Sequence, residues 1–215
     1  MNLDSVTYGN PTQEQLGYLS KDTYLDYLFD DLVPYRFPKN SSEATKEELN
    51  QIVDSIEILK KNENHLKWYR IYDKGFRSFF LEGLKREGID EKESLELINS
   101  VIEDTKPLMM KLKYYFQRPR PSQLAEYYKL KLFPFESKSA DSPSFPSGHA
   151  YQGKIITEIL GNRYPNLYAS MLRIFDDICY SRIYMGLHYQ SDIDVAIFCA
   201  EKVLTDLTFM GKYKL

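Results

Sequence analysis

Apolar residues recur three and four positions apart through most of this sequence, whereas the alternation typical of strands is scarce. The helical spacing is clearest over Leu49–Leu59, Leu95–Ile102, Leu108–Tyr115, Tyr168–Met185 and Asp192–Phe209. A capping box at Thr45 and Glu48 predicts the start of the first of these helices. A chain of 215 residues without repeats or a low-complexity linker is predicted to form one all-α domain over residues 1–215.

Three segments interrupt the helical pattern. An N-terminal arm of about 40 residues carries the turn signal Gly9-Asn10-Pro11 and includes the irregular segment Val33–Pro38. A loop rich in Ser and Pro spans Phe133–Pro146. Cys179 and Cys199 form no CxxC pattern, so they are predicted to be small buried hydrophobic residues.

Composition narrows the class of protein. The net charge of −3 gives no reason to expect a nucleic-acid polymer as partner. No apolar run reaches the roughly 18 to 20 residues of a membrane-spanning helix. The first twenty residues lack the basic start and the apolar stretch of a secretory signal. We therefore expect a soluble, cytoplasmic protein without a transmembrane segment, periplasmic only if an export signal has been removed.

The average charge hides a basic segment between residues 106 and 138. Eight Lys and Arg residues stand there against Glu126 and Glu136, a net charge of +6, which leaves −9 for the remainder of the chain. Such a segment is either a solvated basic face or an anion site in an otherwise acidic protein. Three motifs, the first of which lies within this segment, favour the anion site.

The first motif is Lys111 and Arg118 followed by Pro119, with the spacing K-x6-R-P. Seven residues make two helical turns, so both cations are expected on one helix face. Arg118 is expected at the helix end, because a proline disfavours helical geometry in the residue before it. Lysine supplies a point charge and arginine a planar fork that fits two oxygens of an anion.

The second motif, Pro146-Ser147-Gly148-His149, ends the loop rich in Ser and Pro. Ser147 is a natural N-cap for the helix that the following apolar residues predict, and the free N–H groups of a helix N-terminus suit a phosphate. Gly148 permits a close approach of the backbone, and His149 projects from the first turn. The simpler alternative is a capped helix with an exposed histidine.

The third motif is Ser181-Arg182-x5-His188-x3-Asp192. A carboxylate four residues after the histidine is close enough to accept a hydrogen bond from one ring nitrogen. That bond fixes the tautomer and leaves the lone pair of the other nitrogen free for attack on an electrophile. Arg182 adds a third cation to the predicted site.

In this order the three motifs resemble the signature of the type 2 phosphatidic acid phosphatase and vanadium haloperoxidase superfamily, and they span residues 111–192. The resemblance implies a single-domain helical bundle of that type. The size and helical pattern are most similar to soluble class A non-specific acid phosphatases, which implies a homo-oligomer. Those enzymes carry an export signal and the family's lipid phosphatases carry membrane helices; neither is found in this sequence.

The resemblance implies a metal-independent phosphomonoesterase that acts on a soluble phosphorylated small molecule. His188 would attack phosphorus to form a phosphohistidine, Asp192 would orient His188, and His149 would protonate the leaving group and then activate water. The phosphate oxygens would be held by Lys111, Arg118, Ser147, Gly148 and Arg182. No cofactor is expected, and vanadate would act as an inhibitor.

Several alternatives stay open. Pyrophosphate or a lipid phosphate at a membrane surface is an alternative substrate, and vanadate is an alternative prosthetic group, although haloperoxidases are considerably longer. His149, His188 and Asp192 also have the composition of a two-histidine, one-carboxylate metal site, which three nearby cations disfavour electrostatically. The last alternative is a non-catalytic phosphate-binding protein, against which the intact pair of histidines argues.

The remaining histidine and four tyrosines are not predicted to take part in the reaction itself. His65, in a polar stretch, is predicted to be structural or at the surface. Tyrosines close to the motifs in sequence are candidates to flank the leaving group: Tyr114, Tyr115, Tyr151 and Tyr189.

Overall fold

The computed structural model describes residues 2–215 and contains helices and loops only within that range, which confirms the all-α prediction. The main helices are α3 (Glu43–Lys60), α4 (Glu63–Gly75), α5 (Arg77–Arg86), α6 (Glu91–Phe116), α8 (Gly148–Arg163), α9 (Tyr168–Tyr184) and α10 (Gln190–Leu204). Shorter elements are η1 (Leu3–Ser5), α1 (Gln13–Leu19), α2 (Leu28–Leu32), α7 (Pro121–Ala125), η2 (Pro165–Leu167) and α11 (Leu207–Tyr213).

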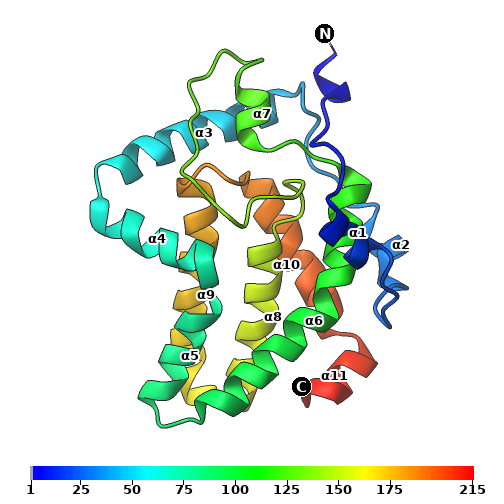
Figure 1. The fold of residues 1–215 in the computed structure, drawn as a ribbon, viewed down its shortest axis with the longest axis vertical. Helices are drawn as coiled ribbons and strands as arrows, with labels where there is room; N and C mark the ends of the chain where they lie inside the picture. Colours follow the sequence, from blue (N-terminus) through cyan, green and yellow to red (C-terminus); the bar gives the residue numbers. More distant parts are fainter. Residues whose placement is uncertain (1) are drawn as a thin grey trace.

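Helix α8 occupies the centre of the bundle, with α9, α10 and α6 packed around it (Figure 1). Small residues permit the close approach of α9, since an added Cβ at Gly153 would lie 3.3 Å from the ring of Phe175. The largest hydrophobic cluster is formed by buried residues of these four helices together with α5 and the N-terminal arm. The core therefore fixes the N-termini of α8 and α10, which carry the second and third motifs.

The predicted helix boundaries need two corrections. Helix α3 begins after Ser42, whose side chain accepts a hydrogen bond from the N–H of Thr45, so the capping box predicted at Thr45 and Glu48 is wrong. The helix predicted over Asp192–Phe209 is divided, because Asp206 caps a new helix, α11, through the N–H of Phe209. In both places a nearby Ser or Asp side chain supplies the cap.

The N-terminal arm, predicted as irregular, contains η1, α1 and α2 and packs along α6 (Figure 1). Its Gln15 side chain donates to the carbonyl of Asp141 at 2.6 Å, which ties α1 to the long loop between α7 and α8. That loop crosses the end of the bundle at which α8 and α10 begin, as Figure 1 shows. It therefore covers the end of the core that carries the second and third motifs.

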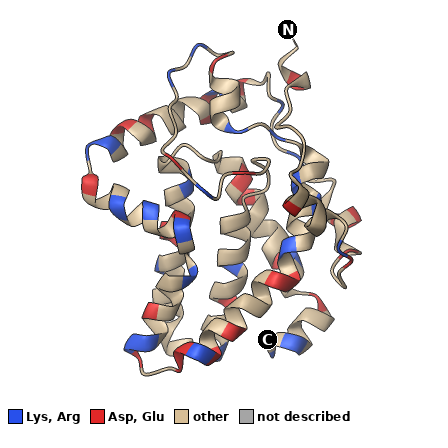
Figure 2. Ribbon diagram, in the orientation of Figure 1, with Lys and Arg blue, Asp and Glu red and all other residues tan. Residues whose placement is uncertain are grey.

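Both signs of charge are spread along the outer helices (Figure 2). Within residues 2–215, no helix is long and apolar enough to cross a membrane. Cys199 is buried and Cys179 is half-buried, and neither is in a disulfide. His65 is exposed on α4, as predicted.

Candidate active site

A cavity of about 290 Å³ lies between α6, the N-terminus of α8 and the turn before α10. It is lined by Lys106, Met109, Met110, Lys113, Arg120, Lys138, Ser139, Asp141, Ser142, Gly148, His149, Gln152 and His188. All four of its cations come from the basic segment 106–138, which supports the anion-site prediction for that segment. A larger cavity of about 840 Å³ lies beside the N-terminal arm. Because no histidine lines it, we do not consider it the candidate active site.

His188 and Asp192 form a buried pair in the turn that leads into α10. The Nδ1 of His188 lies 3.0 Å from Oδ2 of Asp192, as their spacing in the sequence predicts. A carboxylate at Nδ1 favours the tautomer that carries its proton there and leaves Nε2 as the free base. Nε2 lies 2.9 Å from a terminal nitrogen of Arg120, at the wall of the cavity.

Asp192 is completely buried, and protein donors surround its carboxylate. Besides His188, Oδ2 accepts from the hydroxyl of Ser144 and from the backbone N–H of Tyr189, and Oδ1 accepts from Arg118 at 2.6 Å. Burial alone would raise the pKa of this carboxyl, but the Arg118 guanidinium and the bonds from His188 and Ser144 hold the pKa well below its ordinary value. Asp192 therefore stays ionised beside His188.

His149 lies in the first turn of α8, which Ser147 caps by accepting from the N–H of Ala150. The N–H of Ser147 donates to the carbonyl of Asp192 at 2.9 Å, so the starts of α8 and α10 are joined and both histidines face one cavity. The ring of Phe76 packs against His149 at 5.1 Å between centroids. Burial, and then the charge of Arg182, lowers the pKa of His149 well below its ordinary value.

Two buried cations stand at the base of the cavity, Lys113 and Arg120. The Nζ of Lys113 donates to the carbonyl of Pro143 at 2.6 Å. Arg120 donates from Nε to the carbonyl of Ser142 and from a terminal nitrogen to the carbonyl of Leu187, each at 2.8 Å. Neither cation has a carboxylate partner among the described residues, so both are available to an anion.

Lys111 and Arg118, predicted to hold the anion, do not line this cavity. Lys111 pairs with Asp26 of the N-terminal arm at 2.8 Å. Two residues along a helix turn the side chain by about 200°, so Lys111 and Lys113 point to opposite sides of α6. The spacing K-x6-R-P occurs twice, and the second occurrence begins two residues after the first. Lys113 and Arg120 of the second occurrence line the cavity.

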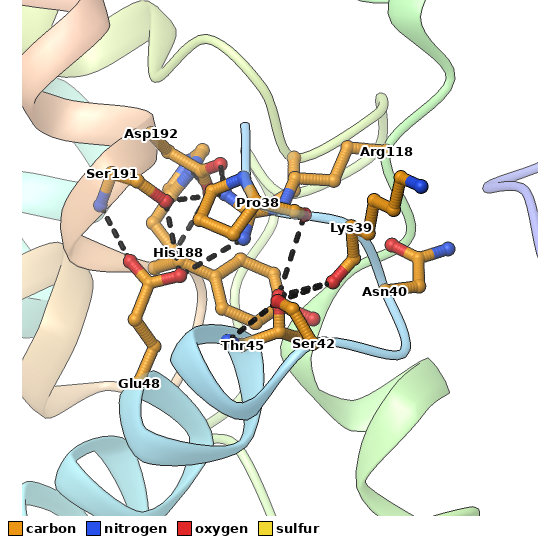
Figure 3. Close-up of polar contacts among 12 residues, drawn as sticks. Pro38, Lys39, Asn40, Ser42, Thr45, Glu48, Arg118, His188, Ser191 and Asp192 are labelled. Atoms are coloured by element: carbon orange, nitrogen blue, oxygen red, sulfur yellow. Dashed lines mark hydrogen bonds and ion pairs between the residues drawn. The ribbon is translucent and has the colours of Figure 1, made fainter. Parts of the chain in front are cut away.

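Arg118 lies beyond the end of α6, which stops at Gln117 in a left-handed conformation with φ of 54°. Its guanidinium contacts Asp192, Ser191 and Glu48, as Figure 3 shows. The side chain is fully buried behind the histidine pair instead of at the anion. Its expected place at the helix end is confirmed, and its expected exposure to the phosphate is corrected.

Arg182 and Ser147 are buried immediately behind the cavity wall. Arg182 donates to Oδ1 of Asp73 at 2.9 Å and to the hydroxyl of Ser139, which does line the cavity. Asp73, on α4, also accepts from the hydroxyls of Ser137 and Ser139. Although burial opposes it, the charge of Arg182 lowers the pKa of Asp73 to about 2. Sequence reasoning missed Asp73, because no motif marks this position on α4.

None of the four tyrosines predicted to flank the leaving group lines the cavity. Tyr151 and Tyr189 are fully buried in the core, and Tyr115 lines the larger cavity beside the N-terminal arm. Tyr114 donates to the side chain of Gln15. The apolar side chains of the cavity wall are Met109 and Met110 of α6, and Gln152 of α8 lies beside them in the wall.

The donor set does not suit a metal ion. Within residues 2–215, no three His, Cys, Asp or Glu side chains are grouped so that they could hold one. His188 turns Nδ1 toward Asp192, and the oxygens of Asp192 are engaged by Arg118, Ser144 and Tyr189. These contacts engage both oxygens of Asp192, the carboxylate of the two-histidine, one-carboxylate alternative.

Fold and cavity together define an all-α protein with two histidines and four cations around one small cavity. A sequence profile of the PAP2 superfamily matches residues 96–204, slightly more than half of the chain and a range that includes every residue of the cavity wall. The chain belongs to the PAP2 superfamily.

Among solved structures, the chain is similar to the transmembrane PAP2-type phosphatidylglycerolphosphate phosphatase from Bacillus subtilis, with 19% identity and a TM-score of 0.38 over 95% of this chain and 88% of that one. Comparison with curated protein sequences gives no significant match.

Proposed function

We propose that this PAP2-superfamily protein is a metal-independent phosphomonoesterase that acts through a phosphohistidine on a soluble phosphorylated small molecule. The observation that carries the proposal is the His188–Asp192 pair at 3.0 Å, with Nε2 of His188 at a cavity that also contains His149 and two cations without carboxylate partners. A histidine held by a carboxylate at Nδ1 keeps its lone pair on Nε2. Arg120 donates to that lone pair at 2.9 Å, and once Arg120 turns to a phosphate oxygen the lone pair is available for nucleophilic attack.

In the first step, the lone pair on Nε2 of His188 attacks phosphorus as the bond to the ester oxygen breaks. The electron pair of that bond leaves with the oxygen, and protonated His149 gives its proton to it, so that a neutral alcohol departs. The imidazole becomes positively charged when it is phosphorylated. Asp192, already ionised, stabilises that charge through the Nδ1 proton.

In the second step, water replaces the alcohol. His149, now neutral, takes a proton from the water while the water oxygen attacks phosphorus and the N–P bond breaks. Its electron pair returns to Nε2 of His188, and inorganic phosphate leaves. The cycle restores both histidines to their starting protonation states and consumes one water molecule.

Lys113 and Arg120 are the residues we propose to hold the phosphate oxygens. Arg120 offers the terminal nitrogen that is not bonded to Leu187 or His188, and Lys113 offers a point charge; both line the cavity. The backbone N–H groups of Gly148 and His149, at the start of α8, add donors that have no partner within the helix. Arg182 supplies charge from behind Ser139.

A second candidate substrate is pyrophosphate. Lys106 and Lys138 also line the cavity and neither forms an ion pair with a carboxylate of residues 2–215, so the site holds more positive charge than one phosphoryl group requires. A leaving group that is itself a phosphate would use these two lysines. The ratio of kcat/KM for pyrophosphate to that for p-nitrophenyl phosphate measures the preference.

The proposed activity is tested by hydrolysis of p-nitrophenyl phosphate in the presence of EDTA. We expect turnover that EDTA does not change, and competitive inhibition by vanadate, because vanadate adopts the five-coordinate geometry of the transition state. Activity lost with EDTA and restored by a divalent cation would contradict the metal-independent mechanism. No inhibition at millimolar vanadate would contradict the phosphate pocket.

The pH profile of kcat/KM is expected to peak below pH 6.5. This parameter reports the free enzyme, in which His149 must be protonated and His188 neutral. Burial lowers the pKa of both histidines below 6.5, with Arg182 acting next on His149 and Arg120 on His188. Asp73 opposes the shift of His149, and Lys113 and Arg120 add to it.

The rise of the profile therefore belongs to deprotonation of His188 and its fall to deprotonation of His149. The measurement is kcat/KM for an alkyl phosphate, whose alkoxide leaving group needs a proton, between pH 4 and pH 9 at constant ionic strength. A value that rose steadily from pH 6 to pH 8 would show that His149 is not the acid.

A further inference from the structure

Behind the histidine pair, Asp192 belongs to a buried network whose other members take part in none of the proposed catalytic steps. These members are Arg118 from the segment after α6, Ser191 from α10 and Glu48 from α3 (Figure 3). Arg118 donates to Oδ1 of Asp192 at 2.6 Å and to Oε2 of Glu48 at 3.0 Å. Arg118 is thus held between two carboxylates.

Glu48 also binds the start of α10 directly. Its Oε1 accepts from the N–H of Ser191 at 2.7 Å, and its Oε2 accepts from the Ser191 hydroxyl at 3.0 Å. A carboxylate at a helix N-terminus is favoured by the free N–H groups and by the helix dipole. The side chain of Glu48 is only 12% exposed, so water competes little for these bonds.

The Arg118 guanidinium cannot easily take another orientation. It stacks on the ring of Tyr189, 3.8 Å from the centroid, and lies 4.7 Å from the ring centroid of Phe37. Stacking holds the plane of the fork, and its two terminal nitrogens then meet Asp192 and Glu48. With one oxygen fixed by Arg118, Asp192 has its other oxygen directed at Nδ1 of His188.

The charges of the network complement those of His188. The charges of Asp192, Arg118 and Glu48 sum to −1 when all three are ionised. When His188 becomes cationic, the net charge of the four residues is zero. Without Glu48, the positive charge of Arg118 would offset more of the negative charge that Asp192 presents to His188. Removing a nearby negative charge disfavours the cationic form of a histidine.

We propose that Glu48, acting through Arg118 and Ser191, is a positioning residue that fixes Asp192 and, through it, the tautomer and basicity of His188. The expected effect on kcat rests on the proposed function, whereas the expected effect on the tautomer and pKa of His188 does not. Glu48 does not line the cavity, and neither does Arg118, so neither residue is expected to bind the phosphate.

The test uses Glu48→Gln, with the neighbouring exposed residue substituted in Glu47→Gln as the matched control. We expect Glu48→Gln to lower kcat about 10- to 100-fold, the range typical of groups that orient a reacting side chain. KM and the inhibition constant for vanadate should stay within about twofold. Glu47→Gln should match the wild type in each of these values.

The rise of kcat/KM at acid pH reports the pKa of His188, which a purely structural role of Glu48 would not change. Charged or titratable groups close to Asp192 and His188 are Arg118, Arg120, Lys113 and each other. Glu48 pairs with Arg118. Since Glu48→Gln removes this negative charge and keeps the side-chain shape, the rise that reports His188 should shift to lower pH. Arg118→Lys, which keeps charge but loses the fork, should recover more kcat than Arg118→Met.

Nuclear magnetic resonance of the imidazole nitrogens keeps the inference testable whatever the substrate proves to be. The chain has only 3 His, so the ring signals can be assigned from single substitutions. In the wild type we expect the Nδ1–H tautomer at His188, and in Glu48→Gln a mixed tautomer and a lower pKa for this residue alone.

An unchanged His188 tautomer and pKa in Glu48→Gln would overturn the inference even in an active enzyme. A raised vanadate inhibition constant with unchanged kcat would overturn it too, because it would make the network part of the anion site. If the wild type proves inactive toward phosphate esters while the tautomer responds as expected, the proposed function fails and the positioning role stands.

Discussion

Lys113→Met is expected to reduce kcat/KM for p-nitrophenyl phosphate by about 10²- to 10³-fold, the usual cost of losing one donor to developing charge. Lys111→Met, two residues earlier on α6, should leave activity unchanged. The two lysines have the same chemistry and nearly the same sequence context, but only Lys113 lines the cavity, while Lys111 pairs with Asp26. Steady-state kinetics of both variants give the comparison.

The electrostatics around Lys113 strengthen this contrast. Burial, and then the neighbouring Arg120, lowers the pKa of Lys113 well below its ordinary value. A phosphate dianion placed between these cations would favour the charged ammonium, so substrate and Lys113 stabilise each other.

Lys113→Met keeps the volume of the side chain and removes a buried charge, and the protein is therefore expected to be at least as thermally stable as the wild type. An equal loss of activity in Lys111→Met, or no loss in Lys113→Met, would contradict this assignment and favour Lys111 and Arg118 as the residues that hold the anion.

This ambiguity shows where the sequence stops determining the site. The motif spacing is satisfied by Lys111 with Arg118 and equally by Lys113 with Arg120, and each arginine precedes a proline. Only the direction of the side chains on α6, set by how that helix packs against α1 and α8, separates the two. The second and third motifs have no such ambiguity, because each has one possible register.

Local chemistry made much of the rest predictable. Ser147 begins α8 and His188 meets Asp192 because these contacts are made within a few residues of sequence. Glu48 and Asp73 were not predicted as parts of the site, since their partners Arg118 and Arg182 lie 70 and 109 positions away. Glu48 was instead assigned to a helix cap that Ser42 supplies, and contacts of this range follow from tertiary packing alone.

His188→Ala is expected to abolish hydrolysis, with a loss of about 10⁴-fold or more, as for other enzymes that lose their nucleophile. No other described side chain can replace it, because only His188 both donates a hydrogen bond to Asp192 and lies at the cavity wall. His65→Ala is the matched control, since His65 is exposed on α4 and should be dispensable. The measurement is single-turnover and steady-state hydrolysis of p-nitrophenyl phosphate.

His149→Ala should behave differently from His188→Ala, and the difference identifies the intermediate. p-Nitrophenolate leaves without needing a proton, so phosphorylation of His188 should still occur in His149→Ala. Hydrolysis of the intermediate needs a base for water and should become slow. We therefore expect a burst of one p-nitrophenolate per enzyme, followed by a slow steady state.

The trapped species should carry phosphate on nitrogen. With a ³²P-labelled ester, His149→Ala should retain label that is released in acid and survives alkali, as an N–P bond requires, and His188→Ala should retain none. Label in His188→Ala would place the nucleophile elsewhere. A wild type that hydrolyses the ester while neither histidine variant loses activity would exclude the two-histidine mechanism, because the cavity contains no other histidine to carry it.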